Sequence, residues 1–204
     1  MQTLQRNITG HRRLVATGAL TLAVAAGSLG LAACGGTNDA ASPGGSVTST
    51  TVEVDGSALP ASDDAAAILF MREEEKLARD VYTVLGEQWD VPTFTNIAAS
   101  ERQHMDAVAT LIDRYGLTDP AADTAIGEFV DPDLQALYDE LIARGSTSLE
   151  EALRVGVLIE ETDIADLAAR ASDDPVVQTV WDRLTAGSEN HLAAFTTALE
   201  RRAS

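Results

Sequence analysis

The chain of 204 residues has a single cysteine, Cys34, and few aromatic residues. One thiol can form neither an intramolecular disulfide nor a multi-thiolate metal site, so the fold must be held together by its core. Basic residues are also scarce: 14 lysines and arginines face 32 acidic residues, for a net charge of −18. That charge argues against nucleic acid or anionic lipid as a binding partner. It raises the local concentration of cations, although solubility alone would also explain it.

The first 33 residues have the pattern of a secretory signal. A basic segment at residues 6–13 precedes the uncharged stretch Leu14–Ala33, and small residues stand directly before Cys34. The tetrad that ends at Cys34 resembles the bacterial lipoprotein signal, in which the cysteine is lipidated and becomes the mature N-terminus. The alternative is a transmembrane anchor, because the stretch is long enough to span a bilayer. Its richness in alanine and glycine, and the cysteine at its end, favour the lipoprotein interpretation.

We therefore expect a lipid-anchored protein on the extracytoplasmic face of the cell membrane of a bacterium. Residues 1–33 are the signal peptide, and residues 34–62 are the lipidated cysteine and a flexible tether rich in Gly, Ser, Thr, Ala and Pro. Residues 63–204 are of ordinary size for one folded domain. Removal of the signal takes away three arginines and no acidic residue, so the mature protein is more acidic still.

Strand signals are nearly absent from residues 63–204, and helix-forming residues dominate. Long helices are predicted from Asp63 or Asp64 to Trp89, over Thr93–Tyr115, over Ser148–Ser172 and from Pro175 to the C-terminus, with a possible bend at Gly187–Ser188. A short extra helix, capped by Asp131, runs from Pro132 to about Arg144 in the crossover between the second and third long helices. The fold class is therefore all-α, an antiparallel four-helix bundle of ferritin-like kind.

Each long helix carries polar residues inside its apolar stripe. In residues 94–115 the apolar side chains follow helical spacing, and Glu101 and His104 fill the two stripe positions left over. A charge in a core costs several kcal/mol unless something neutralises it. The same anomaly recurs on the other three helices, at Glu75, at Glu160 and Asp163, and at Ser188 and His191. A metal site explains all of these positions at once.

The order of these residues repeats, with an acidic helix followed by a histidine helix in each half. Dinuclear carboxylate sites in such bundles use one Glu from each of two helices and a Glu-x-x-His pair from each of the others. Glu101 and His104 make one complete pair, whereas Ser188 stands where the second pair would have its glutamate. The second position is therefore under-coordinated, filled by water, or served by Asp163. His191 alone could also be a hydrogen-bonded core histidine.

Other polar and aromatic residues have simpler interpretations. Glu73 and Glu74, beside Lys76 and Arg79, are expected to form a solvated face with local ion pairs. The aromatic residues Tyr82 and Trp181 are expected in the core rather than as radical relays.

Four segments carry a family resemblance: Met71–Tyr82, Ile97–Met105, Ile159–Leu167 and Gly187–Leu192. Together they resemble the DUF2202 family, a ferritin-like group named as a domain of unknown function. The pattern Glu75-x-x-Ala78-Arg79-x-x-Tyr82 is also similar to the first metal helix of rubrerythrins. That similarity selects Glu75 over Glu74 as a ligand and places Glu160 and Asp163 where rubrerythrins carry two carboxylates. It also marks Ser188 as a departure, because rubrerythrins have a glutamate there.

Two functions remain open. The first is a non-haem iron protein of one or two ions, with manganese possible, bound by Glu75, Glu101, His104, Glu160, Asp163 and His191. Oxidase, ferroxidase or peroxidase-like chemistry is expected there, and oxidation of ferrous ion is the simplest, because a peroxidase would need an electron donor that the sequence does not identify. The second is a non-catalytic binding or structural lipoprotein, in which the buried acids are protonated or salt-bridged. The sequence leaves the catalytic residues and the oligomeric state open, a homodimer included.

Overall fold

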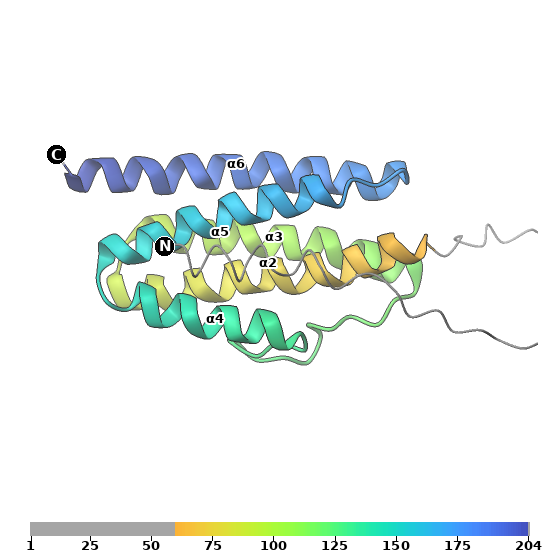
Figure 1. Cartoon of the computed structure of the whole chain (residues 1–204), viewed down its shortest axis with the longest axis horizontal. Helices are drawn as coiled ribbons and strands as arrows, with labels where there is room; N and C mark the ends of the chain where they lie inside the picture. The colour runs from red at the N-terminus through yellow and green to blue at the C-terminus, as the bar shows by residue number, and fades with distance from the viewer. Residues whose placement is uncertain (1–59, 204) are drawn as a thin grey trace, which may run out of the picture.

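The structure is a computed structural model that describes residues 60–203, and within that range the chain is all-helical (Figure 1). Five helices follow one another: α2 (Ser62–Trp89), α3 (Pro92–Tyr115), α4 (Pro132–Gly145), α5 (Leu149–Ala169) and α6 (Pro175–Ala203). The all-α class and the order of long and short helices are confirmed. None of the helices in the described range is long and apolar enough to cross a membrane. The signal peptide, Cys34 and nearly all of the tether lie outside the described residues.

The helix ends follow the capping signals in the sequence. Gly116 ends α3 in the left-handed conformation, with φ 64°. Asp131 caps α4 by accepting hydrogen bonds from the backbone N–H groups of Asp133 and Leu134. Ser148 caps α5 by accepting from the backbone N–H of Glu151 at 3.1 Å.

One helix end differs from the prediction, and one predicted alternative is decided by the structure. Helix α5 ends at Ala169 rather than near Ser172, because the Arg170 backbone leaves the helical region and its carbonyl accepts a hydrogen bond from the Trp181 indole at 3.0 Å. Helix α6 runs without interruption through Gly187 and Ser188, where the sequence had left a bend open.

The four long helices pack as two antiparallel pairs, α2 with α3 and α5 with α6 (Figure 1). The pairs meet where α3 lies against α6 and α2 against α5. The crossover after α3 leads into α4, which packs on α2 and α5 at the lower edge of the view. In this arrangement each long helix turns one face toward the other three.

Apolar side chains form two buried clusters, one toward each end of the four long helices. The first contains Leu77, Val81, Tyr82, Leu85, Phe94, Leu153 and Phe195, and the second contains Ile68, Met71, Val108, Leu111, Ile112, Trp181 and Leu184. Tyr82 and Trp181 are thus core residues, as predicted. Glu75 and Glu101 lie on their helices between residues of the two clusters. A polar layer is therefore enclosed between two apolar ones.

The prediction that Glu73, Glu74 and Lys76 lie on a solvated face is wrong. All three are buried, and Lys76 is 1% exposed. The crossover covers Glu73 and Lys76, and the Lys76 ammonium donates to Asp80 Oδ2 at 2.6 Å and to the carbonyls of Ala125 and Glu128 at 2.7 and 2.9 Å. The Lys76 ammonium is thus solvated by residues about 50 positions further along the chain, rather than by water as the local sequence suggested.

Other side chains of α2 hold the crossover in the same way. Glu73 accepts hydrogen bonds from the backbone N–H groups of Val130 and Asp131. Arg72 pairs with Asp119 at 2.9 Å and donates to the Met105 carbonyl at 2.7 Å. Arg72, Glu73 and Lys76 therefore have partners of opposite charge or main-chain partners, whereas Glu74 Oε2 is buried without a hydrogen bond.

We predict that Asp80→Ala lowers the free energy of unfolding by about 3–5 kcal/mol, because it leaves the buried Lys76 ammonium without its counter-charge. Asp80 also accepts from the Gly127 backbone N–H at 2.9 Å, so the crossover loses a second anchor. Urea denaturation in the presence of a chelator measures the change. Glu150→Ala removes the exposed ion pair with Arg154 and serves as the control, for which no measurable change is expected. An equally small effect for Asp80→Ala would contradict the prediction.

Candidate metal centre

All six residues predicted as metal ligands are buried in the polar layer between the apolar clusters. Glu75 comes from α2, Glu101 and His104 from α3, Glu160 and Asp163 from α5, and His191 from α6. Their exposed fractions range from 1% to 7%. Four helices therefore bring four carboxylates and two imidazoles into one region that water reaches poorly.

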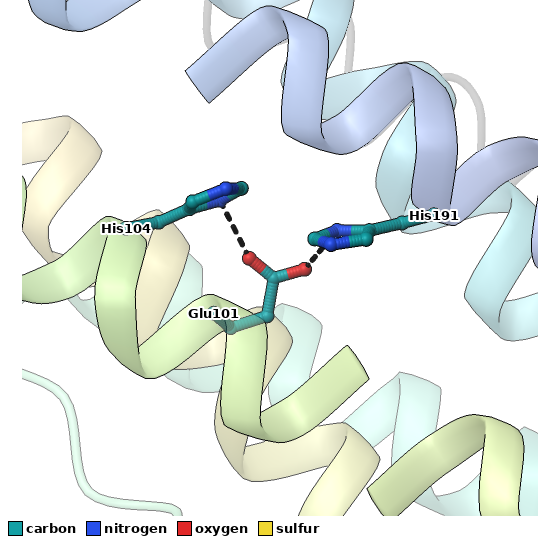
Figure 2. Close-up of side chains that lie close together, drawn as sticks. All are labelled: Glu101, His104 and His191. Carbon is teal, nitrogen blue, oxygen red and sulfur yellow. Dashed lines mark ion pairs between the residues drawn. The ribbon is translucent and has the colours of Figure 1, made fainter. Parts of the chain in front are cut away.

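Glu101 lies at the centre of this cluster. Its Oε2 atom is 2.8 Å from His104 Nδ1, and its Oε1 atom is 2.8 Å from His191 Nδ1. Figure 2 shows one carboxylate oxygen directed at each imidazole, with the two rings on opposite sides. The rings are roughly stacked, with centroids 5.3 Å apart. Glu101 thus links the histidine of the first helix pair to the histidine of the second.

Each histidine has a second glutamate from the antiparallel partner of its own helix. Glu75 Oε2 is 3.3 Å from His104 Nδ1, and Glu160 Oε2 is 3.6 Å from His191 Nδ1. The result is two half-sites that share Glu101: the Glu75 half-site, with His104, and the Glu160 half-site, with His191. The two halves of the sequence repeat therefore place similar coordinating atoms in similar arrangements, one glutamate and one histidine each, around Glu101.

Several oxygen and nitrogen atoms of the cluster that could coordinate a metal have no hydrogen bond. Glu75 Oε1, Glu101 Oε1, Asp163 Oδ1 and His191 Nδ1 are all buried and unpartnered, and the 2.8 Å approach of His191 to Glu101 lacks hydrogen-bond geometry. An unsatisfied buried polar atom costs about 1–3 kcal/mol. A bound cation would satisfy these atoms once the imidazoles have released their protons. The residues present therefore fit a metal ion.

Burial raises the pKa values of three carboxyl groups in the layer. It raises the pKa of Glu160 to about 8 and that of Asp163 to about 7, and the charge of Glu101 adds to both. Burial also raises the pKa of Glu75, with the neighbouring Asp163 as the next cause. Without a cation, these groups hold protons near neutral pH that carboxylates ordinarily lose.

Glu101, at the centre of the cluster, has a lowered pKa instead. Burial would raise the pKa of Glu101, but the two imidazoles outweigh it and hold that pKa at about 2. Burial lowers the pKa values of His104 and His191, but Glu101 and the neighbouring glutamates outweigh it and raise them to about 10 and about 9. The metal-free cluster is therefore an ionised Glu101 between two imidazolium rings, and a metal ion has to displace those protons.

Two residues that contact the ligands were not predicted as part of the site. The Tyr82 hydroxyl donates to Glu160 Oε1 at 2.7 Å, and Ser100 Oγ lies 2.9 Å from His191 Nε2. Such contacts orient metal ligands. Tyr82 could have been found, since it lies on the same helical stripe as Glu75, but no feature of the sequence distinguishes Ser100.

Gly187 is a steric requirement of the site. A Cβ atom at this position would lie 2.3 Å from His104 Nε2. The imidazole therefore packs directly on the backbone of α6, which fixes its Nδ1 atom toward Glu101 and Glu75. The sequence marks Gly187 as a possible helix bend and as the start of a segment that carries the family resemblance, but it does not predict this contact.

The fold and the site together define an all-helical protein with a buried cluster of carboxylates and histidines. The model of the family described as "Uncharacterized protein domain (DUF2202)" matches residues 64–204, so the chain belongs to the DUF2202 family. The chain is also similar to the uncharacterized protein MJ0754 of Methanocaldococcus jannaschii, with 42% identity over 145 residues that cover 68% of this chain and 78% of the relative.

The crystal structure of the hypothetical protein MJ0754 from Methanococcus jannaschii has a similar fold. Its TM-score is 0.68 at 42% sequence identity, over 69% of this chain and 81% of that chain. The predicted resemblance to the DUF2202 family is confirmed by the family match.

We predict that Gly187→Ala destabilises the protein, because the new methyl group drives the His104 ring away from Glu101. The same substitution in a His104→Ala background should instead stabilise α6 by up to about 1 kcal/mol, because alanine favours a helix and the clash is gone. Urea denaturation of the two pairs in chelator measures both effects. A loss of stability that is equal in the two backgrounds would contradict the assigned contact.

We predict that the metal-free protein loses stability as the pH rises from about 6 to about 9. The pKa values of Asp163 (about 7), Glu160 (about 8), His191 (about 9) and His104 (about 10) all lie above the values 3.8, 4.5 and 6.5 expected of the unfolded chain. Stability from a raised pKa is lost as the pH rises through the folded value. Glu101 has the opposite sign, but its contribution is lost only below pH 4.5.

Thermal melts in the presence of a chelator give the measurement, with a lower Tm at about pH 9 than at about pH 6. Glu160→Gln removes one of the titrating groups and should flatten the dependence. A Tm that is constant or rises over this range would contradict the assignment.

Proposed function

We propose that this chain is an exported, lipid-anchored metal-binding protein on a ferritin-like four-helix scaffold, with a non-haem site for one or two ions of iron or manganese. The observation that carries the proposal is Glu101, which directs one oxygen at each of two histidines while buried donor atoms around it have no hydrogen bond. The antiparallel packing of the four long helices supports the scaffold.

The chemistry of the donors favours these metals. Carboxylates with imidazoles suit iron and manganese, whereas the softer ions that prefer thiolate find no ligand here. Glu75, His104 and Glu101 would hold one ion, and Glu160, His191 and Glu101 the other. The carboxylates neutralise the positive charge, and the apolar clusters on both sides exclude water.

When bound, a redox-active ion would supply electrons for the reduction of dioxygen or peroxide. Oxidation of ferrous ion is the simplest activity, because the iron is then the substrate and the electrons come from it. A peroxidase-like activity would also require an electron donor. The residues of the chain would hold the coordinating atoms in place and keep the layer dry. Glu160 and Asp163 would also accept or release protons, because their pKa values are raised to about 8 and about 7.

A second candidate, a binding or structural lipoprotein without a metal, is favoured by one specific observation. Burial raises the pKa values of Glu75, Glu160 and Asp163, so these groups hold protons, and the imidazolium rings neutralise Glu101. The cluster can therefore satisfy its own charges at a cost in unpaired atoms. In that case the acidic surface, rather than the buried layer, carries the function.

Elemental analysis of the purified protein tests the two candidates. We expect the wild type from iron-supplemented culture to hold one to two ions of iron or manganese per chain and the Glu101→Ala/His104→Ala variant to hold none. The matched control is Arg102→Ala/Gln103→Ala, which changes two exposed residues of the same helical turn and should leave the metal content unchanged.

Thermal stability gives the second measurement. Ferrous or manganous ion should raise the Tm of the wild type and of the control but not that of the double variant. A wild type that contains no metal, takes up none on incubation and melts at the same temperature with and without chelator would exclude the metal centre. It would support the binding lipoprotein.

A further inference from the structure

Ser188 replaces the glutamate that a ferritin-like metal site would carry on its fourth helix, yet its hydroxyl contacts another acid. Ser188 Oγ donates to Asp163 Oδ2 at 2.6 Å and also lies within hydrogen-bond distance, 3.0 Å, of the Leu184 carbonyl oxygen one turn earlier. Both side chains are buried, with 1% and 5% exposure. The hydroxyl is thus fixed between the backbone of α6 and the carboxyl group of α5.

The contact leaves the second oxygen of Asp163 free. Oδ1 is buried and has no hydrogen bond, so one oxygen is anchored and the other has no partner among the described residues. An aspartate has a short side chain, and anchoring one oxygen fixes the direction of the other. The arrangement is that of a ligand held by a neighbour, as in the outer contacts that orient metal-binding carboxylates.

The contacts of α6 place Asp163 beside the half-site of Glu75 and His104. Ser188, which holds Asp163, directly follows Gly187, and a Cβ atom at Gly187 would lie 2.3 Å from His104 Nε2. The pKa of Glu75 agrees with this placement, because burial and next the charge of Asp163 raise it. Glu160 lies three residues earlier on α5 and contacts His191 instead. One turn of α5 therefore supplies a carboxylate to each half-site.

We propose that Ser188 is a positioning residue that presents Asp163 Oδ1 as a ligand of the most tightly held metal ion, in the half-site of Glu75 and His104. The inference rests on the proposed function, because it needs a metal centre. It makes the two half-sites unequal. One has carboxylates from Glu75, Asp163 and Glu101, and the other has only those of Glu160 and Glu101, so the first attracts a divalent cation more strongly.

Binding of Mn²⁺ to the metal-free protein, followed by the electron paramagnetic resonance signal of the free ion, tests the proposal. We expect Ser188→Ala to raise the Kd of the first ion by about 10- to 100-fold, the usual effect of losing a contact that orients a ligand. Asp163→Asn should raise it further. In the Asp163→Asn background, Ser188→Ala should have no additional effect, because the hydroxyl acts only through Asp163.

Thr162→Val is the matched control. Thr162 also directs its hydroxyl to a carbonyl one turn earlier, that of Leu158 at 2.8 Å, and should leave the first Kd unchanged. Circular dichroism in chelator checks that each variant is folded. Equal Kd values in wild type and Asp163→Asn, or an undiminished effect of Ser188→Ala in the Asp163→Asn background, would overturn the inference and leave the metal centre intact. A wild type that binds no Mn²⁺ or ferrous ion would overturn the metal centre itself.

Discussion

The balance of charge in the layer between the two apolar clusters decides whether the four long helices can pack there. Glu101 is ionised there because two imidazoles lie 2.8 Å from its oxygens, and each imidazole is held in place by another helix or by the backbone. Without that balance, burial would make the carboxylates too costly to keep. The four long helices therefore meet around one shared carboxylate, and the apolar clusters on either side keep its surroundings dry.

Two sets of buried charges in the protein differ in a way that separates a structural role from a functional one. On the outer face of α2, Lys76 and Asp80 pair with each other and with main-chain groups, so each charge is compensated within the protein. In the polar layer between the apolar clusters, Glu75, Glu101 and Asp163 each leave an oxygen with no hydrogen bond. The first set has its partners within the protein, whereas the second keeps buried oxygen atoms without a hydrogen bond. This contrast, more than the presence of acids in the core, supports a bound cation.

Much of the fold and of the candidate site could be predicted from the sequence, because both follow from helical periodicity. An acid in an apolar stripe is an anomaly that can be seen without a structure, and Glu75, Glu101, Glu160 and Asp163 were found that way. The burial of Glu73 and Lys76 could not be predicted, since the crossover that covers them lies about 50 residues further along the chain. Ser100, Gly187 and the Ser188–Asp163 contact are also tertiary, because each depends on how two helices are rotated against each other.

Hydrogen bonds between side chains of α2 and the backbone of the crossover determine which substitutions the crossover tolerates. Glu73, Lys76 and Asp80 make their hydrogen bonds to backbone atoms of residues 125–131. One side chain of this segment also contacts them, the Phe129 ring, whose centroid lies 4.3 Å from Lys76 Nζ. Side chains of the crossover can therefore be replaced without loss of these bonds, provided that the backbone keeps its path. Gly127 is an exception, because its φ of 80° and the Tyr138 ring beside it leave no room for a larger residue. Replacing the polar residues of α2 therefore breaks these bonds, whereas many side chains of residues 125–131 can change without breaking them. Asp119 differs, because its own side chain pairs with Arg72.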